Sequence, residues 1–169
     1  MKLLSLLLLI TPMTVSASAP FGVTWGEDIT KYGEVTKRLS YSEVKTDNLP
    51  KNNSIAKLYK LVQTPEKGLV KVVMTTHYYS AHGVSFKSDY NDIKNSLIGS
   101  GYQTLVFSSA ELSSYQCVLQ GQCKGKRWVG VDSSGDIVNL EQKMLGRENA
   151  FIHLEFASKD YIDIENQQF

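Results

Sequence analysis

Residues 55–63 and 69–79 are mainly apolar and rich in β-branched and aromatic side chains, which predicts two β-strands. Between them lie Pro65 and Gly68, which supply a fixed φ early in a turn and a positive φ at its end. The sequence therefore predicts a β-hairpin. On its second strand, alternation predicts a core-facing set of Val70, Val72, Met74 and Tyr78 and an opposite set of Lys71, Thr75 and His77.

The period changes in the next stretch, where the apolar residues are Phe86, Tyr90, Ile93 and Leu97. Their spacings of four, three and four positions follow one face of a helix. This predicts one principal amphipathic helix, about residues 86–98, packed on one face of the sheet. We expect Ser85 or Ser88 to cap its start, and Gly99 or Gly101 to end it.

Alternation returns after the helix. It predicts a strand at Tyr102–Phe107, a second hairpin formed by Arg127–Asp132 and Ile137–Met144, and a last strand at Ala150–Phe156. In the last strand, residues 150, 152, 154 and 156 face one way, and Phe151, His153 and Glu155 face the other. Hairpins around one helix predict a single α+β domain with a mainly antiparallel, twisted sheet, wet on one side.

The segment before the first hairpin predicts smaller elements. Residues 21–26 are expected to form a short strand or entry segment with buried aromatic side chains, and residues 27–32 one helical turn that ends at Gly33. Residues 34–44 are rich in β-branched and aromatic residues, which favours an extended conformation. Residues 46–53 are polar and turn-rich, so we expect a surface loop.

The first residues indicate export. Lys2 precedes the short apolar run Leu3–Ile10, and small residues follow at 15–19, as in a secretory signal peptide. We expect the signal peptide at residues 1–17 and the mature domain at 18–169. No later stretch is long and apolar enough to span a bilayer, and no cysteine lies near the cleavage site. The expected product is a soluble periplasmic protein that is not a lipoprotein.

Charge excludes one class of partner. Loss of Lys2 with the signal reduces the 18 Lys and Arg residues to 17, equal to the 17 Asp and Glu residues. Nucleic-acid binders usually carry a basic excess that displaces counterions from phosphates. A neutral, exported chain therefore gives no support for a nucleic-acid partner.

Cys117 and Cys123 are the only two cysteines, and an oxidising compartment predicts a disulfide between them. A reactive thiol pair or a metal site is disfavoured, since the spacing is not Cys-x-x-Cys and no histidine lies nearby. The residues that make this loop a candidate protein interface are Tyr115, Gln116, Gln120, Gln122, Lys124, Lys126 and Arg127. Aromatic and arginine side chains on a rigid loop favour interfaces. The alternative is an ordinary solvated loop with Trp128 in the core.

Two histidines and two tyrosines near one loop form a candidate ligand rim: His77, Tyr78, Tyr79 and His82. Imidazoles and phenols bind metals or move protons. With one histidine on a strand and the other beyond its end, no regular geometry places both on one ion, so we predict no metal site. The alternative is a surface aromatic patch at the sheet edge.

Other chemical signals are weaker. His153 with Glu155 and Glu141 forms either an acid–base pair or an ordinary solvated sheet face. Residues 132–136 start like a calcium loop, but Ile137 and Lys143 stand where that loop needs glycine and glutamate, which favours a hairpin turn. No nucleophile elbow, Ser-x-x-Lys or phosphate-binding glycine loop is present. We therefore predict no catalytic residue, no cofactor and no enzyme activity.

Three segments resemble a loose group of small, mostly uncharacterised exported bacterial proteins. They are residues 21–26 (FGVTWG), residues 58–72 with their Pro-x-x-Gly turn and following helix, and residues 150–156 (AFIHLEF). The resemblance implies a fold and a periplasmic location, and it implies no catalytic residue. The group often carries a cysteine in the strand after the turn, where this chain has Val70.

These observations favour a protein-binding function. We expect an exported inhibitor or immunity-type protein whose partner is an exported effector or an envelope protein. The alternative is a binder of small molecules or cell-envelope ligands that uses the region Tyr78–His82. A small hydrolase that uses His153 or His77 ranks last.

Overall fold

The computed structural model describes residues 18–81, 83–109, 124–145 and 148–162. The strands are β1 (Val35–Lys37), β2 (Ser42–Thr46), β3 (Ala56–Thr64), β4 (Gly68–Thr76), β5 (Tyr79–Ser80), β6 (Gln103–Ser108), β7 (Lys124–Val131), β8 (Ile137–Leu145) and β9 (Asn149–Ala157). The named helices are the 3₁₀ turns η1 (Pro20–Gly22) and η2 (Ile29–Tyr32) and the α-helix α1 (Val84–Gly99), and residues 159–162 are also helical.

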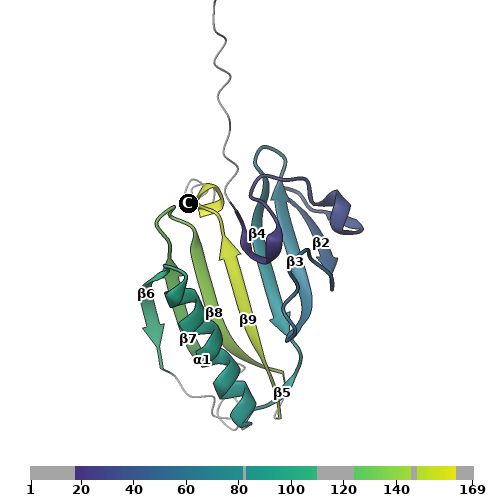
Figure 1. The fold of residues 1–169 in the computed structure, drawn as a ribbon. Helices are drawn as coiled ribbons and strands as arrows, with labels where there is room; N and C mark the ends of the chain where they lie inside the picture. Colours follow the sequence, from purple (N-terminus) through teal and green to yellow (C-terminus); the bar gives the residue numbers. More distant parts are fainter. Residues whose placement is uncertain (1–17, 82, 110–123, 146–147, 163–169) are drawn as a thin grey trace, which may run out of the picture.

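All the strands belong to one antiparallel sheet (Figure 1). Their order is β1-β2-β3-β4-β9-β8-β7-β6, and β5 pairs with β9 beside this path. The chain thus makes one meander, crosses through α1, and makes a second meander whose last strand returns to the centre. This confirms a mainly antiparallel sheet with one principal helix, although the fold is richer in strand than a balanced α+β fold.

The first predicted hairpin is present as β3 and β4. Thr64 pairs with Gly68, and Gly68 has a φ of 65°, as the turn prediction required. Val72 and Met74 lie in the core as predicted. Tyr78 does not: β4 ends at Thr76, so the alternation is lost before Tyr78, whose side chain is 49% exposed.

A bulge in β4 changes the expected alternation. Lys71 pairs with Val62, whereas Leu69 pairs with Gln63, so Val70 is one extra residue on this strand. Leu69 therefore takes the place in the main core cluster that alternation gave to Val70. Val70 is still buried, but outside that cluster.

The predicted helix is confirmed as α1. Phe86, Tyr90 and Leu97 are buried, and Ile93 is partly buried against the core. Gly101 has a φ of 101° just beyond the helix, as one of the two expected terminators. Among the described residues, no helix is long and apolar enough to cross a membrane.

The predicted caps at the start of α1 were wrong. The helix begins at Val84 with Gly83 in the N-cap position, and no side chain caps it. The reason is a turn just before the helix, in which the Gly83 N–H donates to the Ser80 carbonyl at 2.9 Å. This turn starts the helix before Ser85 and leaves both predicted serines inside it.

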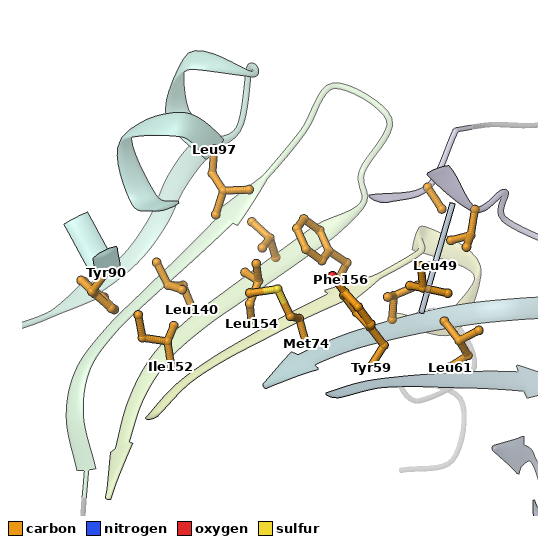
Figure 2. Close-up of a cluster of buried hydrophobic side chains, with 14 of the residues drawn as sticks. Leu49, Tyr59, Leu61, Met74, Tyr90, Leu97, Leu140, Ile152, Leu154 and Phe156 are labelled. Carbon is orange, nitrogen blue, oxygen red and sulfur yellow. The ribbon is translucent and has the colours of Figure 1, made fainter. Parts of the chain in front are cut away.

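The core lies between the sheet and α1, and Figure 2 shows its side chains pointing from β3, β4, β8 and β9 to one side. The second hairpin and the last strand behave as predicted, since Val138 and Leu140 on β8 are buried together with alternate residues of β9. On β7, Trp128 is 1% exposed and its Nε1 donates to Thr104 Oγ1 at 2.9 Å. Trp128 is therefore a core residue.

The N-terminal segment covers the part of the core beyond the helix. The Phe21 ring lies 4.9 Å from the Tyr59 ring and 5.8 Å from the Phe156 ring. Gly26 N donates to the Leu69 carbonyl at 2.9 Å, and Leu69 N donates to the Glu27 carbonyl at 2.9 Å. The segment is thus tied to the start of β4 through its backbone.

The smaller N-terminal predictions hold in part. Residues 20–22 form a 3₁₀ turn instead of a strand, while η2 ends before Gly33 as expected. The extended stretch at 34–44 is divided into β1 and the start of β2 by a turn. The loop at 46–53 is mostly exposed, but Leu49 is buried in the core.

Candidate functional site

The strand registers place a set of polar side chains on the face of the sheet opposite the core, which we call the open face. Glu141 lies opposite His153, and His153 lies opposite Thr75. One step along, Asn139 lies opposite Glu155. The predicted grouping of His153, Glu155 and Glu141 on one sheet face is therefore confirmed.

Glu155 is the most strongly held carboxylate of the open face. Its Oε1 lies 3.0 Å from Lys71 Nζ, and its Oε2 lies 3.8 Å from His153 Nε2. Interaction with His153 and then with the Lys71 ammonium lowers the pKa of Glu155 to about 2, against the opposing effect of burial. The same ion pair raises the pKa of Lys71, although burial alone would lower it. The Tyr161 ring lies 4.2 Å from Lys71 Nζ.

This pKa shift predicts an acid-dependent loss of stability. A depressed native pKa stabilises the fold above the ordinary value of 4.5, and the contribution disappears as pH falls toward about 2. Since the Glu155 side chain is 28% exposed, we expect a contribution of about 1 to 2 kcal/mol. Urea unfolding between these pH values should show a steeper loss for wild type than for Glu155→Gln, while Glu34→Gln, at an exposed site, should follow wild type. Equal slopes for wild type and Glu155→Gln would contradict the prediction.

Glu141 is the centre of a second ion-pair cluster. Its Oε1 lies 3.2 Å from Arg127 Nε, and its Oε2 lies 3.1 Å from Lys143 Nζ. Burial opposes ionisation, but Lys143 and then Asn139 and Arg127 keep the pKa of Glu141 below its ordinary value. A carboxylate held in its charged form between two cations is a poor general base. The cluster acts instead as a fixed charge pattern with a surplus of positive charge.

Two aromatic side chains meet at one end of the open face. The Tyr78 ring lies 6.3 Å from the Phe151 ring, and Lys57 Nζ lies 4.1 Å from the Tyr78 ring centroid. Leu58 lies opposite Thr75 in register, and Leu145 lies on the same side of β8 as Glu141; both leucines are exposed. We call the three residues in contact, Lys57, Tyr78 and Phe151, the aromatic end. The sequence prediction named only Tyr78 of this group, because the others come together through pairing of distant strands.

The described residues of the predicted ligand rim, His77, Tyr78 and Tyr79, do not share one site. Tyr78 belongs to the aromatic end, whereas the Tyr79 hydroxyl donates to Asp89 Oδ2 on α1 at 2.8 Å. Burial and this carboxylate raise the pKa of Tyr79 to about 12. The His77 side chain is exposed beyond the end of β4, and His82 lies outside the described residues. The side chains of Tyr78 and Tyr79 therefore lie on opposite sides of the sheet.

Most of the predicted interface loop also lies outside the described residues. This holds for the disulfide between Cys117 and Cys123 and for Tyr115, Gln116, Gln120 and Gln122. Lys124 begins β7, and the Lys126 backbone N–H donates to Gln142 Oε1 at 3.4 Å. Arg127 lies on the open face, where its Nε contacts Glu141.

The calcium-like stretch forms a hairpin turn, as predicted. Asp132 Oδ1 accepts from the backbone N–H groups of Ser134 and Asp136 at 2.8 and 3.0 Å. Asp136 accepts from Trp25 Nε1 at 2.6 Å and from the Lys159 N–H at 2.9 Å. Both carboxylates are thus used within the fold, and the part of the chain that the structure describes holds no group of three or more His, Cys, Asp or Glu suited to a metal.

A separate cleft lies between η2 and the loop at 46–50. Its volume is about 480 Å³, and it is lined by Lys31, Tyr32, Thr46, Asn48, Leu49 and Pro50. Lys31 Nζ is paired with Glu27 Oε2 at 2.9 Å and lies 5.0 Å from the Tyr32 ring. None of the sequence-predicted site residues lines this cleft.

Comparison of the chain with protein-family models, curated proteins and solved structures found no match.

Proposed function

We propose that the chain is an exported, periplasmic protein that binds another protein and blocks an effector enzyme, as inhibitor and immunity-type proteins do. The observation that carries the proposal is the aromatic end of the open face. Tyr78 is 49% exposed and packs on Phe151 of the open face, and Leu145 on the same face is 53% exposed. Exposed apolar groups that gather in one place, with charged groups beside them, are typical of protein interaction sites.

The residue types fit a binding centre. Tyrosine and arginine are enriched among the side chains that dominate interface energies. Tyr78 is held between Phe151 and Lys57, and Arg127 is held by Glu141, so both are partly ordered before binding. Side chains that are already ordered lose less entropy on binding. The open face therefore offers preformed contacts to a partner.

The charges beside the aromatic end indicate the chemistry of the partner. Arg127 and Lys143 share one carboxylate, Glu141, and Lys57 adds a further cation. This local surplus of positive charge favours a partner surface that carries carboxylates around an apolar centre. An acidic effector enzyme of the same compartment meets this description.

The proposal predicts that Tyr78→Ala weakens partner binding. The partner is captured from periplasmic extract with the wild-type protein and identified, and its affinity is measured by calorimetry. Removing an anchor at the centre of an interface should weaken binding about tenfold or more. Tyr41→Ala, a tyrosine on the turn between β1 and β2 at the far edge of the sheet, should bind like wild type.

Two outcomes would count against the proposal. If Tyr78→Ala bound the captured partner as tightly as wild type, the open face would not be part of the interface. If the protein captured no partner and turned over a substrate as an unbound monomer, the proposed protein-binding function would be wrong.

A further inference from the structure

The sheet ends in two very different edge strands. β1 is three residues long and ends in Lys37, with Arg38 directly after it. β6 is six residues long and contains neither a charged residue nor a proline. Short length and lysine are two of the devices that keep an exposed edge from pairing with another chain. β1 therefore carries both of these devices and β6 carries neither, although the register of β6 with β7 has one bulge, at Leu105. Among the described strands, β6 pairs only with β7 and lies at the edge of the sheet (Figure 1).

β6 presents apolar side chains on both of its sides. Leu105, Val106 and Phe107 are 55%, 51% and 52% exposed. Phe107 lies on the helix side, because Lys94 Nζ on α1 is 5.2 Å from its ring centroid. Val106 lies on the open-face side, because it is opposite Val129 in the register with β7. A strand added at this edge would cover apolar surface on both sides of the sheet.

We propose that β6 pairs with β6 of a second copy of this chain, in an antiparallel arrangement centred on Val106. Such pairing places Val106 against its own copy across a two-fold axis and places Leu105 opposite Phe107 of the second copy. The two sheets then form one continuous sheet. The apolar side chains at the edge lose their exposure to water, and the outward backbone groups of β6 gain partners.

Self-pairing explains why β6 is uncharged. At the centre of a two-fold axis a residue meets its own copy, so a charge at position 106 would face a like charge and destabilise the pair. All six residues of β6 are uncharged. An edge that recognises a different protein gains specificity and association rate from complementary charges, and β6 has none. The aromatic end with Tyr78 packs on Phe151 of β9, which β7 and β8 separate from this edge, so it stays available in the dimer.

Charge substitution at the centre of the strand tests the proposal. Sedimentation velocity of the wild-type protein over a range of concentrations should show a monomer–dimer equilibrium. Val106→Lys and Val106→Glu should each be monomeric, and an equimolar mixture of the two should regain a dimer through the Lys–Glu pair. Thr36→Lys on the opposite edge strand should dimerise like wild type. Regained association also shows that each variant is folded.

Cysteine substitution gives a second, independent test. Under mild oxidation Val106→Cys should form a covalent dimer with a 106–106 linkage, identified by peptide mass spectrometry, while Thr36→Cys should not. Wild type that remains monomeric at all concentrations would overturn the proposal. So would a dimer of Val106→Lys as tight as that of wild type, or a Val106→Cys protein without the 106–106 linkage. Protection of β6 amides by a different protein, with monomeric wild type, would assign the edge to that protein instead.

Discussion

Replacement of Gly68 by alanine is expected to lower the free energy of unfolding by about 3 kcal/mol or more. Gly68 has a φ of 65°, which costs an alanine about 1 to 2 kcal/mol. A β-carbon at this position would also overlap the backbone carbonyl of Gly26. Neither backbone can move away freely, because Gly26 N donates to the Leu69 carbonyl. Forced displacement of packed groups costs a further 1 to 3 kcal/mol, in round figures.

Urea denaturation followed by circular dichroism measures this effect. Gly99→Ala is the matched control, because a β-carbon at Gly99 meets no atom within 4 Å and its φ is not in the left-handed region. In a helix, alanine is favoured over glycine by about 1 kcal/mol, so this variant should be as stable as wild type or slightly more stable. If Gly68→Ala were as stable as Gly99→Ala, the N-terminal segment would not pack tightly against the hairpin turn at Gly68.

Much of the fold could be predicted because alternation is a local signal. The second hairpin and β9 follow an uninterrupted period of two, so the buried residues Val138, Leu140, Ile152 and Leu154 could all be identified. The bulge at Val70 could not, since one extra residue leaves no mark in an apolar run. The contact of Gly26 with Leu69 could not either, because it joins residues that are distant in sequence.

The candidate site divides in the same way. His153 and Glu155 are two residues apart on one strand, so their shared face follows from the strand period alone. Lys71, which holds Glu155 at 3.0 Å, comes from β4 and is placed by the pairing of the first meander with β9. The same long-range pairing brings Phe151 to Tyr78. The sequence therefore predicts which side of the sheet a residue faces. It does not predict which residues of other strands lie beside it.

The second large effect is expected at Trp128, which attaches the edge strand β6 to the rest of the sheet. Its side chain is 1% exposed, its Nε1 donates to Thr104 Oγ1 on β6, and its ring lies over Gly130. Trp128 is also opposite Phe107 in the β6–β7 register. Truncation to alanine removes a large buried ring and leaves a cavity, so Trp128→Ala should lower the free energy of unfolding by about 3 to 5 kcal/mol.

The variants Trp128→Phe and Thr104→Val separate the effect of lost side-chain volume from the effect of the lost hydrogen bond between Trp128 and Thr104. Phenylalanine keeps most of the buried ring, and valine keeps the shape of threonine, so each should cost about 1 to 2 kcal/mol, which is less than the alanine variant. Hydrogen exchange should localise the damage, because β6 pairs only with β7 among the described strands. The amides of residues 103–108 should lose protection in Trp128→Ala before those of β8 and β9. If protection fell equally in all these strands, Trp128 would be a general core residue and would have no special part in holding the edge.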